Sequence, residues 1–413
     1  MVMRIATKTI YDNGVSQLNT LQAQLQKTQM QLSTGRRVVT PSDDPVASAR
    51  ALEVSQSKEM NVQFASNRSS AKGSLSLVDN TLANTDDLLQ EVKSKIVAAG
   101  NPGFTLADRE ALAKELDGRL QDLLGQANAT DGSGAYLFSG YKSDTQPFTR
   151  TTTGATYNGD QGQRELQVAS SRTLATSETG TAVFENNLTG NGTFQTSVDP
   201  NNYTRGGTGI ISPGVVKNTA ALTGHNYTLN FTVVPGAAGA PSTTTYTVND
   251  VTTGTAVLSG QPYVAGQPIA FDGMSMDVSG VPANGDIFNV DPSKNQSVFQ
   301  TMTDLISALR GPSGSPQAGA ALTNALNLAN QNISNSLDNV LSVRASVGAR
   351  LSEVDHLDSA GDDLNLQYSS QISDLVDLDP VEAISRFTQQ QTTLEAAQKS
   401  YKALAGLSLF NLI

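Results

Sequence analysis

The chain has 413 residues, 16% of them charged, and a formal net charge of −11 at pH 7. This acidic balance argues against a nucleic-acid partner, because affinity for nucleic acid depends on Lys and Arg meeting phosphates. The absence of cysteine removes disulfides, thiolate chemistry and cysteine-based zinc sites. No run approaches the roughly 18 apolar residues of a membrane span, and the start MVMRIATKTIYDNG lacks the apolar core of a secretory signal peptide. These signals alone favour a cytosolic protein.

The first 40 residues are predicted to form a helix with heptad character. Its apolar residues recur at 3–4 spacing and form what we call the N-terminal seam: Leu18, Leu21, Leu25 and Leu32. Thr28 lies on the same seam, Tyr11 extends it backwards, and Lys27 is the only charge between Val15 and Leu32. A face of Gln, Asn and Thr suits a helix surrounded by copies of itself. An ordinary amphipathic helix in a monomer core fits the pattern equally well.

The stretch LSTGRRVVTPSDDP breaks this helix sharply. We call the break the elbow and define it by six residues: Gly35, Arg36, Arg37, Asp43, Asp44 and Pro45. Gly35 is suited to a left-handed helix C-cap. Asp44 followed by Pro45 is typical of an N-cap with proline at the first helical position. The elbow therefore stops one helix and starts another.

A long helix is predicted from Pro45 to Ala99, spanning about 80 Å if it is unbroken. Thr85 fills a seam position in a series of apolar residues at 3–4 spacing: Leu75, Val78, Leu82, Leu89, Val92 and Ile96. Thr105 and Asp108 then predict the cap of a third helix. The apolar face of that helix consists of Leu112, Leu116, Leu120 and Leu123.

The middle of the chain is predicted to be β structure, from about residue 141 to 290. A strand is expected at 136–138, after the turn residues of TDGSG. The segment HNYTLNFTV alternates, with Tyr227, Leu229, Phe231 and Val233 on one face. The segment IAFDGMSMDV reads as two strands joined by an Asp272-Gly273 turn. Short strands with Gly- and Pro-rich turns predict a small sandwich or barrel inserted into a helical body.

Helical periodicity returns near Val298 and continues to the end of the chain. The segment DPVE, Asp379–Glu382, has the cap, proline and acid that a helix start needs. What we call the C-terminal seam follows it: Phe387, Leu394, Ala397, Tyr401 and Leu404. The expected fold is thus a mainly α, long-helix rod with an inserted all-β domain. Its expected segments are 1–40, 41–140, 141–290, 291–370 and 371–413, the outermost two being assembly helices that pair with each other.

No catalytic or metal-binding constellation is recognisable. His225 and His356 each stand without a second His or Cys nearby, so neither a metal site nor a Ser-His-Asp triad is favoured. Ser55 and Lys58 match S-x-x-K, but the other motifs of that hydrolase set are absent. The carboxylate pairs Asp43-Asp44 and Asp377/Asp379 have the ligand chemistry of Ca²⁺ sites, but their neighbouring prolines favour helix capping. We therefore expect no cofactor, no metal and no enzymatic activity.

The residues that carry a family resemblance lie at both ends of the chain. LSTGRRVVTPSDDPVASARAL closely resembles the N-terminal signature of bacterial flagellin-like proteins, and its PSDDP looks like the hook–filament junction proteins among them. MRIATKTIYDNG, ATDGSGAYLFSGYKSDTQPF, DGMSMDVSGVPANGDIFNVDPSKNQSVFQTMTDLISAL and AQKSYKALAGLSLFNLI are also similar to that family. The resemblance covers about residues 3–141 and 272–413, whereas residues 148–271 match nothing recognisable.

The resemblance implies a structural protein that leaves the cell through the flagellar type III route, which needs no cleaved signal peptide. It replaces the cytosolic assignment with an extracellular one, at the hook–filament junction. It also implies terminal helices that pair on assembly, an export chaperone beforehand, and an adaptor that forms one homo-oligomeric ring. Its neighbours would be another hook-associated junction protein and flagellin, which the ring would seed. The four charged residues of the elbow would contact neighbouring subunits, or equally would be surface charges of an intramolecular elbow.

Three alternatives remain open from the residues. A divergent flagellin would form the filament itself, although PSDDP and the ending SLFNLI count against it. The β insert would be an adhesin or glycan-binding module if its scattered tyrosines, Tyr203, Tyr227, Tyr246 and Tyr263, formed aromatic platforms. A hydrolase in the insert is the weakest alternative, because it needs clustered acids or a nucleophile with a base.

Overall fold

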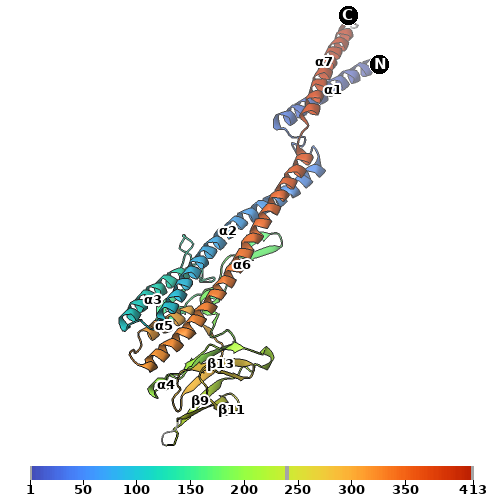
Figure 1. The fold of residues 1–413 in the computed structure, drawn as a ribbon. Coiled ribbons are helices and arrows are strands. Elements are labelled where there is room, and N and C mark those ends of the chain that lie inside the picture. The colour runs from blue at the N-terminus through green and yellow to red at the C-terminus, as the bar shows by residue number, and fades with distance from the viewer. Residues whose placement is uncertain (1, 238–240, 411–413) are drawn as a thin grey trace. The chain divides into compact units, whose positions relative to one another are not determined.

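The computed structural model describes the backbone of residues 2–237 and 241–410 and the side chains of residues 8–237 and 241–403. The chain divides into two compact units (Figure 1). The first contains Met1–Arg68 and His356–Ile413, and the second contains Ser69–Asp355. The fold is mainly helical, with the N- and C-terminal helices packed together and an all-β domain inserted, which confirms the predicted fold class. The five-segment division stays a prediction.

Long helices account for both ends of the chain. They are α1 (Val2–Thr34), α2 (Pro45–Ala99), α3 (Leu106–Ala127), α5 (Val298–Leu309), α6 (Pro316–Val376) and α7 (Pro380–Phe410), and the short α4 (Asn201–Thr204) lies in the insert. The predicted unbroken helix from Pro45 to Ala99 is confirmed. Prolines stand at the first position of three of these helices, where their missing N–H costs nothing.

The helices of the second unit share a buried apolar core. The predicted seam of α2 is buried throughout, and Thr85 is fully buried with its hydroxyl donating to the Thr81 carbonyl at 2.8 Å. All four predicted leucines of α3 are buried. Thr105 and Asp108 form the predicted capping box. The α5 stripe is buried as well, and it places Phe299 against Phe148 and Phe184.

The insert contains two packed antiparallel sheets. The larger has the order β11-β10-β9-β14-β6, and the smaller has β12-β13-β7 with β8 also on β13. Their strands are β6 (Phe194–Val198), β7 (Ile210–Ile211), β8 (Val215–Val216), β9 (Tyr227–Val234), β10 (Thr243–Asp250), β11 (Thr255–Pro262), β12 (Pro268–Phe271), β13 (Met274–Ser279) and β14 (Ile287–Pro292). Residues of both sheets share one core, so the insert is the predicted sandwich. The predicted inward face of β9 is confirmed for Tyr227, Leu229 and Phe231.

Short two-stranded pairs pack against the helices of the second unit. β1 (Phe148–Thr151) and β2 (Gly154–Tyr157) form one hairpin, and β3 (Glu165–Ala169) and β4 (Arg172–Ala175) form another. β5 (Asn187–Leu188) pairs with β15 (Asn295–Gln296), which follows the sandwich in the chain. One turn of π-helix (Thr181–Glu185) and one of 3-10 helix (Thr219–Ala221) complete this region. The predicted Asp272-Gly273 turn joins β12 and β13, with φ of 41° and 78°, as a two-residue hairpin with both φ values positive requires.

The strand predicted at 136–138 is wrong. The segment makes only isolated bridges, Thr130 to Tyr136 and Ser139 to Thr179. Phe138 is instead fully buried against Phe184 in an edge-to-face contact. The segment 136–138 is therefore a loop anchored by its aromatic residues. Gly132, Gly134 and Gly140, which have positive φ, turn the chain before and after the segment, so it does not extend into a strand.

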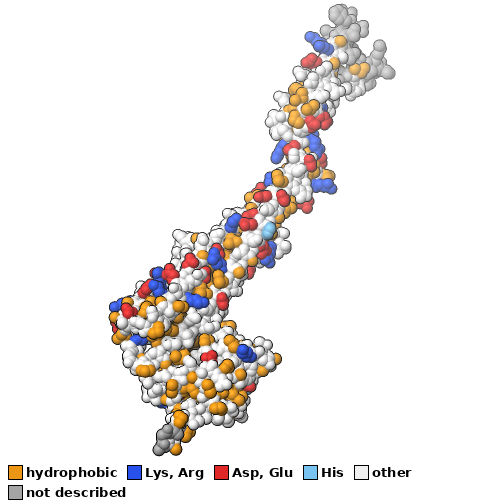
Figure 2. All heavy atoms as spheres, in the orientation of Figure 1, with side chains coloured by type: hydrophobic (Ala, Val, Ile, Leu, Met, Phe, Trp, Pro, Cys, Tyr) orange, Lys and Arg blue, Asp and Glu red, His pale blue; other side chains and the backbone are white. Residues whose placement is uncertain are grey.

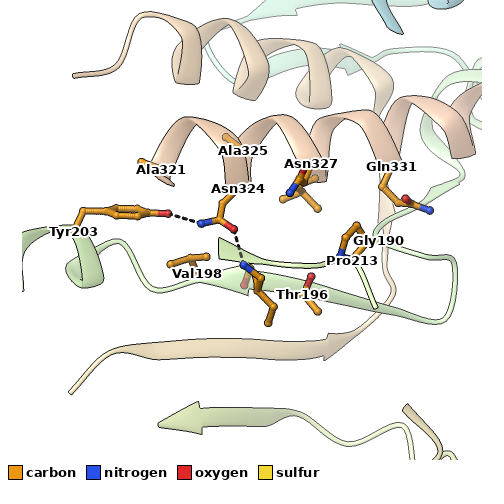
Figure 3. Close-up of a pocket in the computed structure, with 13 residues that line it drawn as sticks. Gly190, Thr196, Val198, Tyr203, Pro213, Ala321, Asn324, Ala325, Asn327 and Gln331 are labelled. Carbon is orange, nitrogen blue, oxygen red and sulfur yellow. Dashed lines mark hydrogen bonds between the residues drawn. The ribbon is translucent and has the colours of Figure 1, made fainter. Parts of the chain in front are cut away.

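Asparagines of α6 hold the insert and the segment before it. We call them the asparagine row: Asn324, Asn332, Asn335 and Asn339. The Asn324 amide donates to the Gly209 carbonyl at 3.0 Å and to the Tyr203 hydroxyl at 3.3 Å, and its oxygen accepts from the Ile211 N–H at 3.0 Å (Figure 3). These bonds border a small cavity of about 240 Å³ between α6 and the sandwich.

The rest of the asparagine row binds backbone between residues 182 and 190. The Asn332 oxygen accepts from the buried Gly190 N–H at 2.9 Å. Asn335 donates to the Gly190 carbonyl at 2.8 Å. Asn339 donates to the carbonyls of Ala182 and Val183 at 2.9 and 3.0 Å. Amide side chains therefore satisfy backbone groups of a segment that contains only one π-helical turn and a two-residue strand.

Candidate assembly surface

In the first unit, α1 and α7 pack against each other along matched series of less exposed side chains. On α1 these are Gly14, Leu18, Leu21, Leu25, Thr28 and Leu32. On α7 they are Ala383, Phe387, Gln390, Leu394, Ala397 and Tyr401. Both series step by four and three residues, the spacing of a coiled-coil seam. Tyr11 lies beside Tyr401, with ring centroids 5.4 Å apart, and Gly35 lies beside Leu378, so the two helices run antiparallel.

The structure thus brings the two predicted seams together. All four leucines of the N-terminal seam are partly buried, and Leu394 is only 9% exposed. The side chain of Leu404 lies outside the described residues. Sequence reasoning missed Gly14, where an added Cβ would lie 2.9 Å from the Tyr401 ring. A glycine opposite a large aromatic residue is the signal that would have located this close approach.

Apolar side chains away from the seams remain exposed on all four helices of the first unit. Each of the following is more than half exposed: Ile10, Met30, Val46, Leu52, Met60, Leu366, Val381 and Ile384. On the face shown in Figure 2, Lys, Arg, Asp and Glu are interspersed along the long helices, and few of them lie on the insert. Pairing of α1 with α7 therefore covers only one stripe of each helix.

At the elbow, backbone hydrogen bonds connect the two chain segments that make up the first unit. Gly35 has the predicted left-handed conformation, with φ of 67°. Its carbonyl accepts from the Leu378 N–H at 3.0 Å, and the Arg37 N–H donates to the Val376 carbonyl at 2.7 Å. Beneath these bonds Val376 packs with Val38, Ala47 and Ala51 in a small buried cluster. The elbow, where α1 stops and α2 starts, is therefore also where the N-terminal segment of the first unit is hydrogen-bonded to its C-terminal segment.

Three of the four charged residues of the elbow have intramolecular partners. Arg37 donates to the Leu375 carbonyl at 2.7 Å and pairs with Asp44 at 3.2 Å. The other oxygen of Asp44 accepts from the Ala47 N–H at 3.0 Å, as predicted for an N-cap. Asp43 accepts from the Thr40 N–H at 2.8 Å. These contacts fit the intramolecular alternative, and further contacts with neighbouring subunits stay a prediction.

Lys27 and Asp43 form the ion pair that ties α1 to the elbow. Their charged atoms are 2.8 Å apart, and the Asp43 side chain is 15% exposed. The Lys27 ammonium and the backbone N–H groups of Thr40 and Val39 hold the pKa of Asp43 well below its usual range. The only charge in this part of α1 is therefore used to fix the elbow. The backbone N–H of Ala47 and the Arg37 guanidinium likewise lower the pKa of Asp44.

We expect Asp43→Asn to lower the thermal stability of the first unit at pH 7 and to have a smaller effect at pH 3. The pKa of Asp43 is lower in the folded state than in the unfolded chain, so the unfolded chain takes up the proton first as the pH falls. The stabilisation contributed by the ionised Asp43 is therefore fully present above about pH 4 and is lost as the pH falls. Thermal unfolding of both proteins at the two pH values measures the difference. A difference in Tm that grows on acidification would contradict this assignment.

The remaining candidate residues are dispersed. His225 bonds through Nδ1 to Asp250 at 2.7 Å, whereas His356 is exposed on α6. Burial would raise the pKa of Asp250, but hydrogen bonds from Thr253 and His225 lower it to about 2.

Among the described residues no group of three or more His, Cys, Asp or Glu side chains is placed to hold a metal. Within the same residues, every helix is too short or too polar to cross a membrane.

The acidic pairs and the insert tyrosines are also accounted for. Asp379 accepts from the Val381 N–H at 2.8 Å, which confirms capping, and Asp377 accepts from the Ser373 hydroxyl at 2.6 Å. Tyr227 is buried in the core of the sandwich, and three further tyrosines of the insert are partly buried: Tyr203, Tyr246 and Tyr263. These tyrosines are therefore not arranged as an open aromatic platform.

Paired terminal helices, an elbow and an inserted β domain define a flagellin-like structural protein. In agreement, residues 5–143 match the family model described as the bacterial flagellin N-terminal helical region. Flagellin B of Helicobacter pylori is 31% identical over 137 residues, which are 33% of this chain and 26% of that protein. The flagellin likeness thus covers one end of the chain.

The relatives that match the whole chain are more specific. Flagellar hook-associated protein 3 of Salmonella typhimurium is 30% identical over 411 residues, 99% of each chain, and the Escherichia coli protein of the same name is 29% identical over the same length. The solved structure of the Legionella pneumophila hook-associated protein 3 covers 78% of this chain and 98% of its own, with 33% identity and a TM-score of 0.73. The chain belongs to the flagellar hook-associated protein 3 family and is a structural component of the bacterial flagellum.

Proposed function

We propose that this chain forms the adaptor ring between hook and filament, with another hook-associated junction protein on one side and flagellin, whose assembly it seeds, on the other. The observation that best supports this role is the apolar surface that α1, α2, α6 and α7 leave exposed in the first unit. Exposed apolar residues of this kind favour burial against other protein chains. Copies of this chain would cover part of that surface within the ring, and the two neighbouring proteins would cover the rest.

The proposal includes the route to the flagellum. The chain would be secreted by the flagellar type III pathway without a cleaved signal peptide, and an export chaperone would bind it beforehand. The exposed apolar residues support this step, because they would favour premature association in the cytoplasm. No reaction is part of the proposed role, since the relatives are structural proteins.

An epitope tag inserted between β9 and β10 tests the location by immunogold electron microscopy of intact flagella. A single gold cluster where hook meets filament supports the adaptor role. Gold along the whole filament would make the chain a flagellin, and flagella without gold would refute a structural role there. The same insertion leaves both assembly helices unchanged, so loss of label is not explained by a broken seam.

Arg36 gives a sharper prediction for the elbow. Its side chain is exposed, and within the described part of the chain it has no ion-pair partner. We expect Arg36→Glu to reduce incorporation into flagella about fivefold, because an opposite charge at a subunit contact costs on the order of 1 kcal/mol. Arg36→Lys keeps the charge and should incorporate normally. Immunoblots of purified flagella compare the two, and equal incorporation would remove Arg36 from the interface.

A further inference from the structure

Two loops of the second unit line an open cavity with both polar and apolar side chains. They are the loop from α2 to α3 and the loop from α5 to α6. The first turn of α3 and the first three turns of α6 complete the lining, and the volume is about 550 Å³. Its polar lining residues are Asn101, Thr105, Arg109, Ser313, Ser315 and Thr323. Arg109 is the only charged residue among all those that line it.

Arg109 is a buried cation without a counter-charge. The residue is 6% exposed, and its Nε atom has no hydrogen-bond partner. Among the described residues, its guanidinium takes part in none of the ion pairs. The preceding residue, Asp108, makes no ion pair with it; one oxygen of that carboxylate accepts from the N–H and hydroxyl of Thr105 at 2.9 and 2.7 Å, in the helix cap. A largely buried guanidinium without a counter-charge favours an anion beside it, because an unpaired charge is poorly solvated there.

The surrounding groups add hydrogen-bond donors and positive potential. The N-termini of α3 and α6, helices of 22 and 61 residues, both lie at the cavity and carry partial positive charge. Ser315 accepts from the Ala318 N–H at 3.1 Å, which leaves its hydroxyl proton free to donate. The oxygen of Asn101 accepts from the Gly103 N–H at 3.0 Å, which leaves its amide group to donate.

We propose that this cavity binds a small oxyanion, a phosphate or a carboxylate, which pairs with the Arg109 guanidinium. The Asn101 amide and the hydroxyls of Ser313 and Ser315 would donate to its remaining oxygens. The inference concerns a separate site in the second unit and does not rest on the proposed role in the flagellum.

Thermal unfolding of the full-length protein tests the site with sodium phosphate and with sodium acetate, each against sodium chloride at equal ionic strength. We expect phosphate, acetate or both to raise the Tm of the wild type by about 3–8 °C near saturation. A phosphate response identifies a phosphate site, and an acetate response alone identifies a carboxylate site. No rise beyond that in sodium chloride would overturn the proposal.

Variants separate anion binding from a purely structural role of Arg109. Arg109→Met should raise the Tm in sodium chloride without phosphate or acetate and should lose the response to those two anions, because it removes the unpaired charge and keeps much of the volume. Arg109→Lys keeps the charge, so it should retain a weaker response even if the Met variant does not fold. Arg119→Met is the matched control, since Arg119 lies on the exposed side of α3, the helix that carries Arg109, and pairs with Glu91 of α2. An Arg109→Met protein that responds as the wild type does would refute the site.

Discussion

Leu394→Asp is expected to leave hooks without filaments and to release flagellin into the medium. Leu394 is 9% exposed and lies in the C-terminal seam, opposite α1. The substitution removes about 1.5–3 kcal/mol of apolar burial and places a carboxylate at a contact between two helices that is now apolar. Since 1.4 kcal/mol is a factor of ten, pairing of α1 with α7 should weaken more than a hundredfold. Electron microscopy of hooks, with flagellin measured in the medium, gives the result.

Leu394→Met is the matched control for this experiment. It nearly conserves volume and apolar character and should cost less than about 1.5 kcal/mol. Normal filaments in the Met variant and none in the Asp variant would assign the loss to the seam. Normal filaments in both would mean that α1 and α7 do not need to pair in the assembled structure.

The double variant Asn332→Ala/Asn339→Ala is expected to destabilise the second unit by about 2–6 kcal/mol. It removes two amide side chains, one from the buried Gly190 N–H and one from the part-buried carbonyls of Ala182 and Val183, and the loss of each side chain should cost about 1–3 kcal/mol. Denaturant unfolding followed by circular dichroism measures the loss. Limited proteolysis should first cleave within residues 182–190.

Asn327→Ala serves as the control on the same helix. Asn327 lines the small cavity beside Asn324, but among the described residues it makes no hydrogen bond to the insert (Figure 3). Its replacement should change the stability by less than about 0.5 kcal/mol. A double variant as stable as this control would show that Asn332 and Asn339 do not hold residues 182–190 in place.

The elements that periodicity and caps specify were predictable from the sequence. The α2 helix, its buried face and the Thr105 cap follow from local signals that agree with the tertiary packing. The two seams were also recognisable, because a 3–4 repeat specifies which side of a helix is buried. The repeat does not state the partner, so the antiparallel pairing of α1 with α7 needed the structure.

Contacts between residues far apart in the sequence were not predictable. Lys27 resembled an isolated surface charge until the fold placed it 2.8 Å from Asp43. The asparagine row was not recognised from the sequence, because an amide side chain gives no sequence signal of the backbone it will bind. The loop at 136–138 has strand-like residue types, but burial of Phe138 prevailed over its strand propensity.

Cross-linking in assembled flagella tests whether α1 and α7 of the same subunit pair with each other. The chain has no cysteine, so Tyr11→Cys/Tyr401→Cys introduces the only two thiols, at positions whose rings are 5.4 Å apart. Flagella purified from cells with this variant are treated with a short bismaleimide and denatured. If α1 and α7 of one subunit pair, the cross-link forms within one chain and gives a monomer with altered electrophoretic mobility. Dimers and larger covalent species, or an absence of cross-links, would contradict pairing of α1 with α7 of the same subunit.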